Sequence, residues 1–310
     1  MKKTKRLVKN NHYECIYIRY PNSDPAFIKL LKVLKKNGSK IVVEIPTYPY
    51  DLEKAKSLRA KVIRFLDTRY RKKIHNYVSR LVTYSDDENI FGIKTINTVN
   101  GYDFSKTDIC NADYNKSEIH LCAVATLYGL HGYDRLIEGM HNYYLNGGSR
   151  KVIFDVVGYG DSGILESYKD LVKKYKLSNN VIFYGKLLGE KLEEVYKKAT
   201  LGVNSLAIHR EGLKKESTLK TREYAAKGLP ILSSSLVDAF SDEDNKMFVC
   251  LVSADDSPIN IENIISFCDN IYGNNDVNSL RIDIRKKSQK ICDMPVTLKG
   301  VVNFFNDKGV

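Results

Sequence analysis

The chain has 310 residues, of which 43% are hydrophobic and 28% are charged, and its formal net charge is +12. This length and apolar content are typical of about two domains with full cores, and no apolar run approaches the ~20 residues that a membrane-spanning helix needs. The Lys-rich start lacks the apolar core of a signal peptide, so we expect a cytoplasmic protein whose positive charge favours nucleotide phosphates, an acidic membrane face or nucleic acid.

The first part of the chain alternates short apolar strands with helices. We expect a helix over 26–36 because Phe27, Leu30, Leu31 and Leu34 fall on one face. The expected strands are 15–20, 41–45, 80–84 and 95–99. The proline-rich segment 46–51 follows the strand 41–45 as a loop at its carboxyl end.

A long basic helix is expected over 52–78. Its Lys and Arg residues alternate with apolar ones such as Leu58, Val62 and Phe65. Two interpretations remain open. Such a helix suits docking on an anionic membrane surface. It is also what an amphipathic helix looks like when it packs on its own sheet and exposes a basic outer face.

A polar segment, 111–116, marks the expected domain boundary, giving domains 1–115 and 116–310. Beyond it, helices such as 133–145 and 190–199 alternate with short strands, which predicts a parallel, doubly wound sheet. The expected strands are 119–125, 151–157, 181–184, 201–205, 230–234 and 248–252. The last helix, 296–306, is expected to pack back on the first domain.

The stretch 216–230 lies between two of these strands and predicts a ligand site. Ser217 is the expected N-cap of a helix over 218–227, which Gly228 and Pro230 end. A helix that begins at the carboxyl end of a parallel strand presents free N–H groups to an anion. Lys220 and Arg222 would add positive charge, and Glu223 could accept hydrogen bonds from a ribose. The alternative is an ordinary amphipathic helix with a solvated basic edge.

Several short motifs occur in a shared order: Asn100-Gly-Tyr-Asp103, His131-Gly-Tyr-Asp-Arg135, Val157-Gly-Tyr-Gly160, Val181-Ile-Phe-Tyr-Gly185 and the helix with Glu223 before Gly228-Leu-Pro230. Together they resemble the retaining GT-B glycosyltransferases of family 4, over nearly all of 14–306. The resemblance implies an α/β, GT-B-like fold in which two Rossmann-type, doubly wound parallel-sheet domains face a cleft. Fewer strands precede the second domain than the family usually has, so the N-terminal domain is expected to be incomplete.

By this resemblance the protein transfers a sugar, with retention, from a nucleotide sugar to a polysaccharide or lipid-linked saccharide, as in envelope or capsule assembly. The resemblance assigns catalytic roles to Glu216 and Lys220. The family's two glutamates are separated by seven residues, whereas the position eight before Glu223 is Lys215 and Glu216 is the nearest glutamate. The donor-binding candidates are Thr126, His131, Gly158, Lys186, Leu187, Arg210, Ser217, Thr218, Leu219, Arg222 and Glu223.

Some of these positions depart from the family's pattern. Thr126 and His131 stand where the family has an Arg and a Lys that clasp the diphosphate. His131 is therefore a phosphate contact or a structural histidine that caps its helix, and Lys220, Arg222 and Arg210 are candidates for the missing charge. The loop at Lys186 and Leu187 resembles one that holds the nucleotide base by backbone contacts, although a plain turn would have similar residues.

Segment 46–51 stands where family members often carry a histidine of the catalytic site. This chain has no histidine there, and the resemblance makes Glu44, Tyr48 and Tyr50 candidates for lining the cleft.

No metal or other cofactor is expected. GT-B enzymes work without a bound metal, and the six scattered cysteines, Cys15, Cys110, Cys122, Cys250, Cys268 and Cys292, form no C-x-x-C pair and are expected to be reduced. The expected partners are the donor, the acceptor, an anionic membrane surface at the inner face of the cell membrane, and a second copy of the chain. The rival interpretation is a non-catalytic remnant that binds a nucleotide and needs a partner chain. A nucleic-acid-binding protein rests on charge alone.

Overall fold

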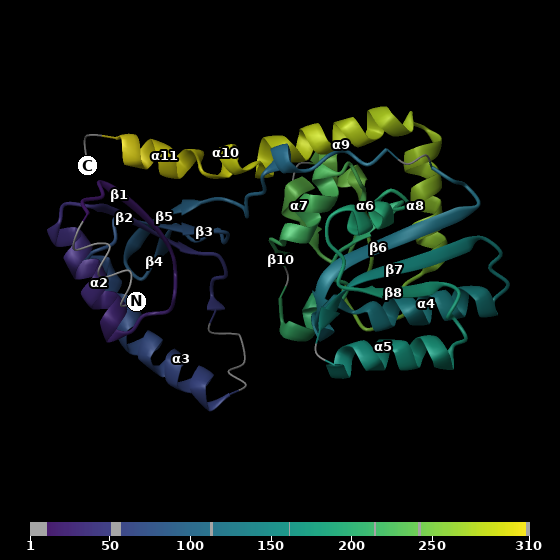
Figure 1. Ribbon diagram of the computed structural model, residues 1–310, viewed down its shortest axis with the longest axis horizontal. Helices are drawn as coiled ribbons and strands as arrows, with labels where there is room; N and C mark the ends of the chain where they lie inside the picture. Colours follow the sequence, from purple (N-terminus) through teal and green to yellow (C-terminus); the bar gives the residue numbers. More distant parts are fainter. Residues whose placement is uncertain are drawn as a thin grey trace. The chain divides into compact units, whose positions relative to one another are not determined.

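The computed structural model describes residues 11–50, 57–111, 114–160, 162–213, 215–240 and 243–307. The chain divides into two compact units (Figure 1): unit 1 comprises 1–100 and 295–310, and unit 2 comprises 101–294. This division falls before the boundary expected after residue 115. The reason lies in segment 101–110, where the Tyr102 N–H donates to the Cys292 carbonyl at 2.9 Å and the Cys110 N–H donates to the Lys227 carbonyl at 2.9 Å.

Unit 1 is built on a sheet with the strand order β1-β2-β3-β5-β4. The strands are β1 (Cys15–Arg19), β2 (Lys40–Ile45), β3 (Arg80–Thr83), β4 (Asn89–Ile90) and β5 (Ile93–Asn97). All neighbours are parallel except β4 and β5. In the described part of the sheet β1 pairs with β2 alone, so β1 is an edge strand.

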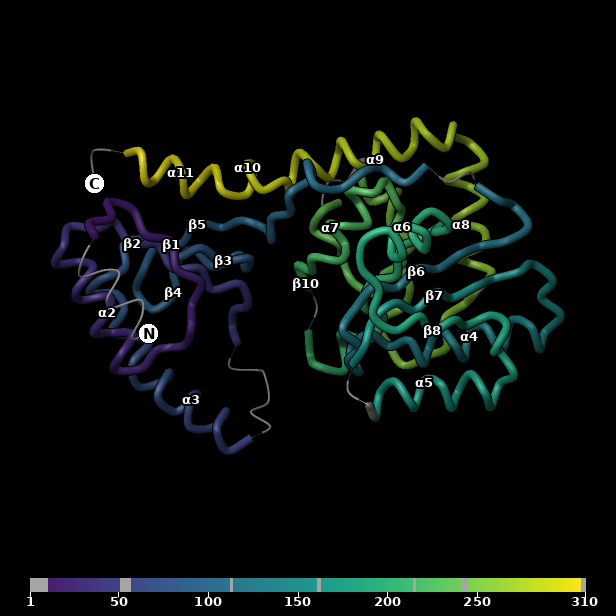
Figure 2. The backbone as a smooth tube through the Cα atoms, viewed as in Figure 1, coloured from purple at the N-terminus to yellow at the C-terminus, as the bar shows by residue number. Residues whose placement is uncertain are grey.

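Helices cover both faces of this sheet. On one face, helix α2 (Pro25–Lys36) buries Phe27, Leu31 and Leu34 against the side chains of Ile41 and Val43. On the other face, α11 (Lys299–Asn306) places Val301 against Val42 and Val82, and Figure 2 shows this yellow helix beside the purple and blue strands. Unit 1 is therefore completed by residues from both ends of the chain.

The expected long helix over 52–78 is shorter in the structure. Residues 51–56 lie outside the described residues, α3 spans Leu58–Tyr70, and a 3-10 helix, η2, spans Arg71–Asn76. The change of helix type brings Ile74 into the core. The single buried residue of α3 is Asp67, whose carboxylate accepts hydrogen bonds from the hydroxyls of Tyr20 and Tyr50, each at 2.6 Å.

Unit 2 contains a six-stranded parallel sheet with the order β13-β11-β9-β6-β7-β8. Its strands are β6 (Glu118–Leu127), β7 (Lys151–Gly160), β8 (Val181–Gly185), β9 (Leu201–Val203), β11 (Ile231–Ser233) and β13 (Val249–Leu251). These are the six strands expected from the sequence, with small differences at their ends. The predicted class, α/β with parallel sheets, is confirmed.

The helices of unit 2 lie on both faces of the sheet. They are α4 (Tyr133–Leu145), α5 (Ser162–Lys174), α6 (Glu190–Tyr196), α7 (Leu219–Ala226), α8 (Ile261–Gly273) and α9 (Val277–Cys292), and α10 (Met294–Thr297) follows. The ring of Tyr133 on α4 contacts Phe154 of β7 with centroids 5.2 Å apart. On the opposite face, Tyr224 of α7 packs where Gly202 of β9 has no side chain, because a Cβ there would lie 2.3 Å from the Tyr224 ring. The start of α7 lies at the carboxyl end of β9, because the Thr218 hydroxyl donates to the Asn204 side chain, directly after β9, at 3.3 Å.

Three two-residue strands were not predicted: β4 in unit 1, and β10 and β12 in unit 2. β10 (Lys215–Glu216) and β12 (Leu236–Val237) form a separate parallel pair, in which Glu216 is opposite Val237. Among the described residues, no helix is long and apolar enough to cross a membrane.

Candidate functional site

Helix α7 begins without a side-chain cap. Its N-cap is Thr218, in an extended conformation, and the Thr218 side chain makes no capping bond to the helix. The expectation that Ser217 caps this helix is therefore wrong, because the Ser217 hydroxyl donates to Asp238 at 2.6 Å instead. An uncapped helix start leaves its first N–H groups available to a ligand.

Two predicted residues, Lys220 and Glu216, meet at this helix start through a serine. The Lys220 ammonium donates to the Ser205 hydroxyl at 3.0 Å, and that hydroxyl donates to Oε2 of Glu216 at 3.1 Å. The other carboxylate oxygen of Glu216, Oε1, is buried and has no hydrogen-bond partner among the described residues. The three side chains thus form a short polar chain with one unused acceptor.

The electrostatic environment of this cluster brings the pKa of Lys220 closer to neutral pH, although the side chain remains mostly charged at pH 7. Burial lowers the pKa of Lys220 to about 8, although the nearby Glu216 carboxylate opposes the shift. A half-buried lysine whose charge is poorly compensated gains from an anion placed beside it. Lys220 is therefore the described cation at the start of α7 that is best poised to respond to a phosphate.

His131 makes a structural capping contact, which does not exclude the phosphate contact that was its other interpretation. It lies at the end of η4 (Gly129–His131), and its Nδ1 accepts a hydrogen bond from the Tyr128 N–H at 3.0 Å. Burial, helped by the charge of Lys220, lowers the pKa of His131 to about 3. The ring is thus neutral with its proton on Nε2, so it can donate one hydrogen bond but supplies no positive charge.

Arg222 does not supply charge to a ligand. It is completely buried, and its guanidinium forms an ion pair with Asp238 of η6 (Asp238–Phe240) at 2.6 Å. It also donates to the hydroxyls of Ser217 and Thr221, at 2.8 and 2.9 Å. Its assignment as a donor-binding residue is corrected to a structural one: Arg222 fixes the start of α7 to η6 from inside the protein.

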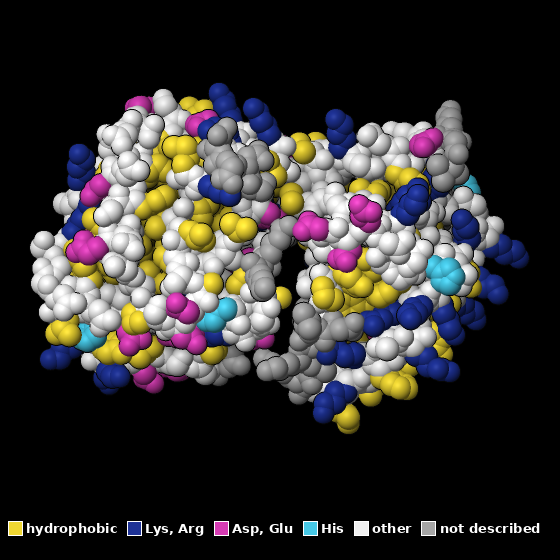
Figure 3. Space-filling view, turned by 180° about the vertical axis from the view of Figure 1, so that it is seen from behind, with side chains coloured by type: hydrophobic (Ala, Val, Ile, Leu, Met, Phe, Trp, Pro, Cys, Tyr) yellow, Lys and Arg dark blue, Asp and Glu magenta, His cyan; other side chains and the backbone are white. Residues whose placement is uncertain are grey.

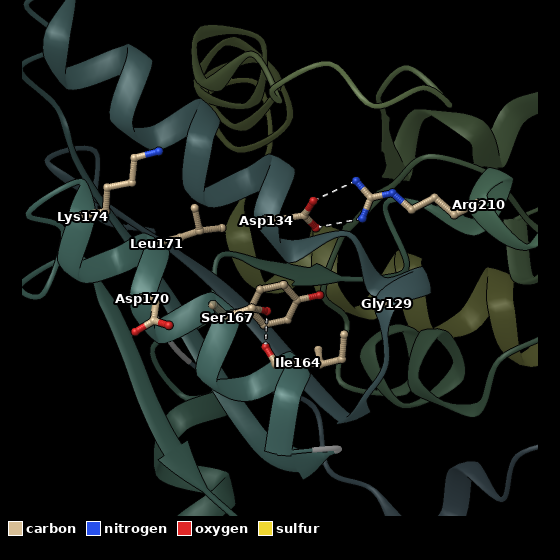
Figure 4. A pocket seen from close by; sticks show the side chains of 9 residues that line it. Gly129, Asp134, Ile164, Ser167, Asp170, Leu171, Lys174 and Arg210 are labelled. Carbon is tan, nitrogen blue, oxygen red and sulfur yellow. Dashed lines mark hydrogen bonds and ion pairs between the residues drawn. The ribbon is translucent and has the colours of Figure 1, made fainter.

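Arg210 is also committed elsewhere. It lies on η5 (Ile208–Glu211) and contacts both carboxylate oxygens of Asp134, at 3.1 and 2.8 Å, and Asp256 at 2.7 Å. These two carboxylates raise the pKa of Arg210. Figure 4 shows Arg210 directed at Asp134, beside a cavity of about 610 Å³ lined by α5 residues such as Ser167 and Leu171. The expectation that Arg210 provides missing charge is not supported, because its charge is already balanced.

Glu223 lies one turn inside α7, half-buried, on the side that faces α6. Burial raises its pKa, while Tyr196 and the Lys227 ammonium act in the opposite direction. Lys227 itself forms an ion pair with Glu193 at 2.7 Å. Glu223 is thus a carboxylate held in a partly dry environment, where a hydrogen bond from a ligand hydroxyl would be strengthened.

The other donor-binding candidates lie at the ends of neighbouring strands. Thr126 is exposed near the end of β6. Gly158 on β7 has φ +141°, and a Cβ there would lie 1.8 Å from the Ala125 carbonyl oxygen, so Gly158 serves the close approach of β7 to β6. Lys186 follows β8 and is exposed, with its ammonium 5.8 Å from the centre of the Tyr159 ring, and Leu187 beside it is half-buried. Leu219, in the first turn of α7, is exposed.

The candidates in unit 1 are held by hydrogen bonds and packing within that unit. Glu44 accepts from the hydroxyls of Tyr17 and Tyr84, each at 2.8 Å, and pairs with Arg19 at 3.4 Å. Tyr48 and Tyr50 pack together with centroids 6.4 Å apart. Each of these three side chains therefore has a structural role within unit 1.

Ser205 was not predicted as a functional residue, although it links Lys220 to Glu216. The signal that could have identified it is positional. Asn204 and Ser205 directly follow the buried strand β9, and polar residues at the carboxyl end of a parallel strand commonly contact ligands.

Comparison with known proteins gives the fold. No family model and no curated protein sequence matches this chain. Solved glycosyltransferase structures do match. A glycosyltransferase from Rickettsia africae has a TM-score of 0.70 at 14% identity, and the match covers 100% of this chain and 81% of that one. HepE of Anabaena in complex with UDP gives 0.66 at 12% identity, covering 97% and 81%. Sucrose-phosphate synthase from Thermosynechococcus elongatus gives 0.65 at 14% identity, covering 98% and 76%. The chain therefore has the Rossmann-type fold of GT-B glycosyltransferases, as predicted.

Proposed function

We propose that this protein transfers a sugar, with retention, from a nucleotide sugar to a saccharide or lipid-linked saccharide, as in polysaccharide assembly. The observation that carries the proposal is the uncapped start of α7, where Lys220 and the unused oxygen of Glu216 converge through Ser205. Glycosyltransferases of the same fold, such as HepE, have been solved with UDP and with UDP-glucose, which supports a nucleotide sugar as the donor class.

In the proposed reaction the bond between the anomeric carbon and the diphosphate oxygen breaks, and the leaving diphosphate gains negative charge. A bond forms from the anomeric carbon to the hydroxyl oxygen of the acceptor on the same face of the sugar, and the hydroxyl proton passes to the leaving diphosphate. The first N–H groups of α7 and the Lys220 ammonium would stabilise that charge, so this task falls to the protein's own groups and not to a metal ion. The His131 Nε2–H would donate one further hydrogen bond. Oε1 of Glu216 would accept a hydroxyl of the donor sugar and so orient its anomeric carbon.

The remainder of the donor would extend along the same edge of the sheet. Glu223 would accept hydrogen bonds from the ribose hydroxyls, and the backbone at Lys186 and Leu187 would contact the base. The supporting observations are the half-buried carboxylate one turn inside α7 and the exposed loop that follows β8.

The test is a thermal-shift panel of nucleotide sugars, followed by hydrolysis and transfer assays on each nucleotide sugar that stabilises the protein. We expect stabilisation by at least one nucleotide sugar, slow hydrolysis, and release of the sugar with its anomeric configuration retained, measured by NMR. An inverted product would refute retention. If no nucleotide sugar binds, the proposed function is wrong.

We further propose that α3 docks unit 1 on an anionic membrane surface at the inner face of the cell membrane. Leu58, Val62 and Phe65, one helical stripe, are 80%, 52% and 69% exposed, and Arg59, Lys61 and Arg69 are exposed among them. Figure 3 shows basic side chains beside apolar ones on the lower right, where unit 1 lies. Apolar side chains ringed by cations suit insertion among anionic headgroups.

Vesicle co-sedimentation tests the docking proposal. Phosphatidylglycerol vesicles should sediment the protein and neutral phosphatidylcholine vesicles should not, and replacing Leu58, Val62 and Phe65 together by Ser should abolish binding. The replacement of Leu145, Leu188 and Leu236 by Ser is the matched control, since these side chains are equally exposed but lie in unit 2. Unchanged binding of the α3 variant would refute the assignment.

The alternative function is a nucleotide-binding protein that needs a partner chain for activity. The observation that favours it is the edge strand β1, whose outer side is unpaired among the described strands and which exposes Tyr17. An open strand edge favours association with another chain. Light scattering combined with a transfer assay separates the two functions: a monomer that transfers sugar is the enzyme, whereas a dimer, or a monomer that binds donor without transfer, supports the alternative.

A further inference from the structure

Tyr159 presents its ring on an open face at the carboxyl end of β7. The residue is 56% exposed and lies opposite Thr126 of β6 in the strand register. Because side chains alternate along a strand, Tyr159 lies on the face opposite to Phe154, which α4 covers. Helix α7 covers the Tyr159 face over β9, where Tyr224 packs on Gly202. The ring of Tyr159, two strands away, is left exposed.

The backbone on both sides of this ring is held in place. A Cβ at Gly158 would lie 1.8 Å from the Ala125 carbonyl oxygen, and a Cβ at Gly160 would lie 2.5 Å from the Leu127 carbonyl oxygen. Both positions thus admit only glycine because β7 and β6 approach so closely. The exposed ring consequently stands on a backbone with little freedom to move, which lowers the entropy that a stacked ligand must overcome.

A cation accompanies the ring. The Lys186 ammonium lies 5.8 Å from the centre of the Tyr159 ring, and no ion pair involves Lys186 in the described part of the chain. In contrast, Arg210, Arg222 and Lys227 are each paired with a carboxylate. A flat ring beside a free ammonium suits a planar heterocycle that carries carbonyl oxygens, because the ring offers stacking and the ammonium offers a hydrogen bond.

The position of Tyr159 relative to α7 fits one class of ligand. The strand order places β7 two strands from β9, after which Ser205 contacts Lys220. Two strand spacings amount to about 10 Å, a distance comparable with that between the base and the diphosphate of a nucleotide. We propose that the Tyr159 ring is the stacking surface for the nucleobase of the donor and that Lys186 contacts a base carbonyl. This inference rests on the proposed function and names the part of the site that recognises the base.

The experiment compares ligands with and without a base. Binding of UDP, GDP, ADP and inorganic pyrophosphate to the full chain is measured by calorimetry for the unaltered protein and for Tyr159→Leu, Tyr159→Phe and Lys186→Met. Removal of the ring should weaken the best nucleotide about tenfold and leave pyrophosphate unchanged. Tyr159→Phe should retain the affinity, Lys186→Met should lose less than Tyr159→Leu, and Tyr13→Leu, which replaces an exposed tyrosine of unit 1, should change nothing.

Each other result has one meaning. Unchanged nucleotide affinity in Tyr159→Leu refutes the inference, and so does an equal loss for pyrophosphate, since it would show that Tyr159 acts through the fold. If the unaltered protein binds pyrophosphate but none of the nucleotides, the base has no site and the inference is wrong. If the unaltered protein binds neither class of ligand, the proposed function itself is wrong.

Discussion

Among the described residues, charged side chains near the amino ends of strands β6 and β7 are paired, whereas some near the carboxyl ends of the sheet are not. At the amino ends, the ring of His120 lies between Asp155 and Glu118, at 2.6 and 2.7 Å, and Glu118 also pairs with Lys151 at 2.9 Å. At the carboxyl ends, the described residues leave Lys186 without an ion pair and Oε1 of Glu216 without a hydrogen bond. Charges that are matched within the protein stabilise the sheet, and charges left unmatched indicate where a ligand is bound.

The largest loss of stability should follow from disrupting the charge cluster around His120 at the amino ends of the strands. Asp155→Ala leaves the ring of His120 and the hydroxyl of Tyr184 without their buried acceptor. We expect the free energy of unfolding, measured in urea, to fall by about 3–5 kcal/mol. The control is Lys151→Ala, whose exposed charge should contribute less than about 1 kcal/mol. A similar loss of stability in both variants would show that the cluster around His120 stabilises the protein no more than an exposed charge does.

At the carboxyl ends of the strands, a substitution should weaken nucleotide binding without lowering the free energy of unfolding. Glu223→Gln keeps the size of the side chain but removes the charge that accepts ribose hydroxyls, so nucleotide affinity should weaken by about 1.5–3 kcal/mol in calorimetry. Unfolding in urea should change little, because burial already disfavours the charge of Glu223. Glu194→Gln, on the exposed surface of α6, is the control. Unchanged nucleotide affinity in Glu223→Gln would refute its assignment.

Lys220→Ala should have a smaller effect and a distinctive pattern. Binding of UDP should weaken about tenfold, equal to about 1.4 kcal/mol, while binding of uridine should change little. The ligand-free protein should be as stable as the unaltered one or more so, since a poorly compensated, half-buried cation at a helix start is removed. Equal losses for UDP and uridine would show that Lys220 does not act on the diphosphate.

The two ends should also differ in how their contribution to stability depends on pH. Burial lowers the pKa of His120, but the hydrogen bonds and charges of Asp155 and Glu118 outweigh it and raise the pKa above 6.5. The stability from His120 is therefore full below pH 6.5 and is lost as the pH rises through the raised value. Lys220 behaves oppositely: its pKa is about 8 in the folded protein and 10.5 when unfolded, so stability rises with pH between these values.

Urea unfolding across pH 5 to 10 separates the two contributions. In His120→Gln, the loss of stability that occurs as the pH rises through the raised pKa of His120 should disappear. In Lys220→Met, the rise of stability above pH 8 should disappear. Each change should amount to about 1.4 kcal/mol per unit of pKa shift. A His120→Gln profile parallel to that of the unaltered protein would show that the matched cluster does not hold a proton.

The sequence predicted those parts of the fold that have long periodic patterns. Helix α4 has the expected bounds, 133–145, and the six strands of unit 2 appear in their expected places. The two-residue strands β10 and β12 are too short to show any alternation. The helix expected over 52–78 was too long because charge spacing continues through η2, while burial of Ile74 decides where α3 ends.

The candidate site was predicted only where neighbours in sequence are also neighbours in space. The start of α7 places Glu216 and Lys220 together because one short segment carries both. In contrast, the partners that neutralise the two arginines are distant: Asp238 for Arg222, and Asp134 with Asp256 for Arg210. No local pattern reveals such pairs, and therefore the sequence indicated available charge where the structure has ion pairs.

The division of unit 1 between 1–100 and 295–310 has a consequence for synthesis. One face of its sheet, with Val42 and Val82, is covered by Val301 of α11. A ribosome therefore releases unit 2, one continuous segment, before it releases the helix that completes unit 1. We expect the first hundred residues to expose this apolar face until α11 has been synthesised. Chaperones should therefore bind, through that face, to nascent chains stopped before residue 299.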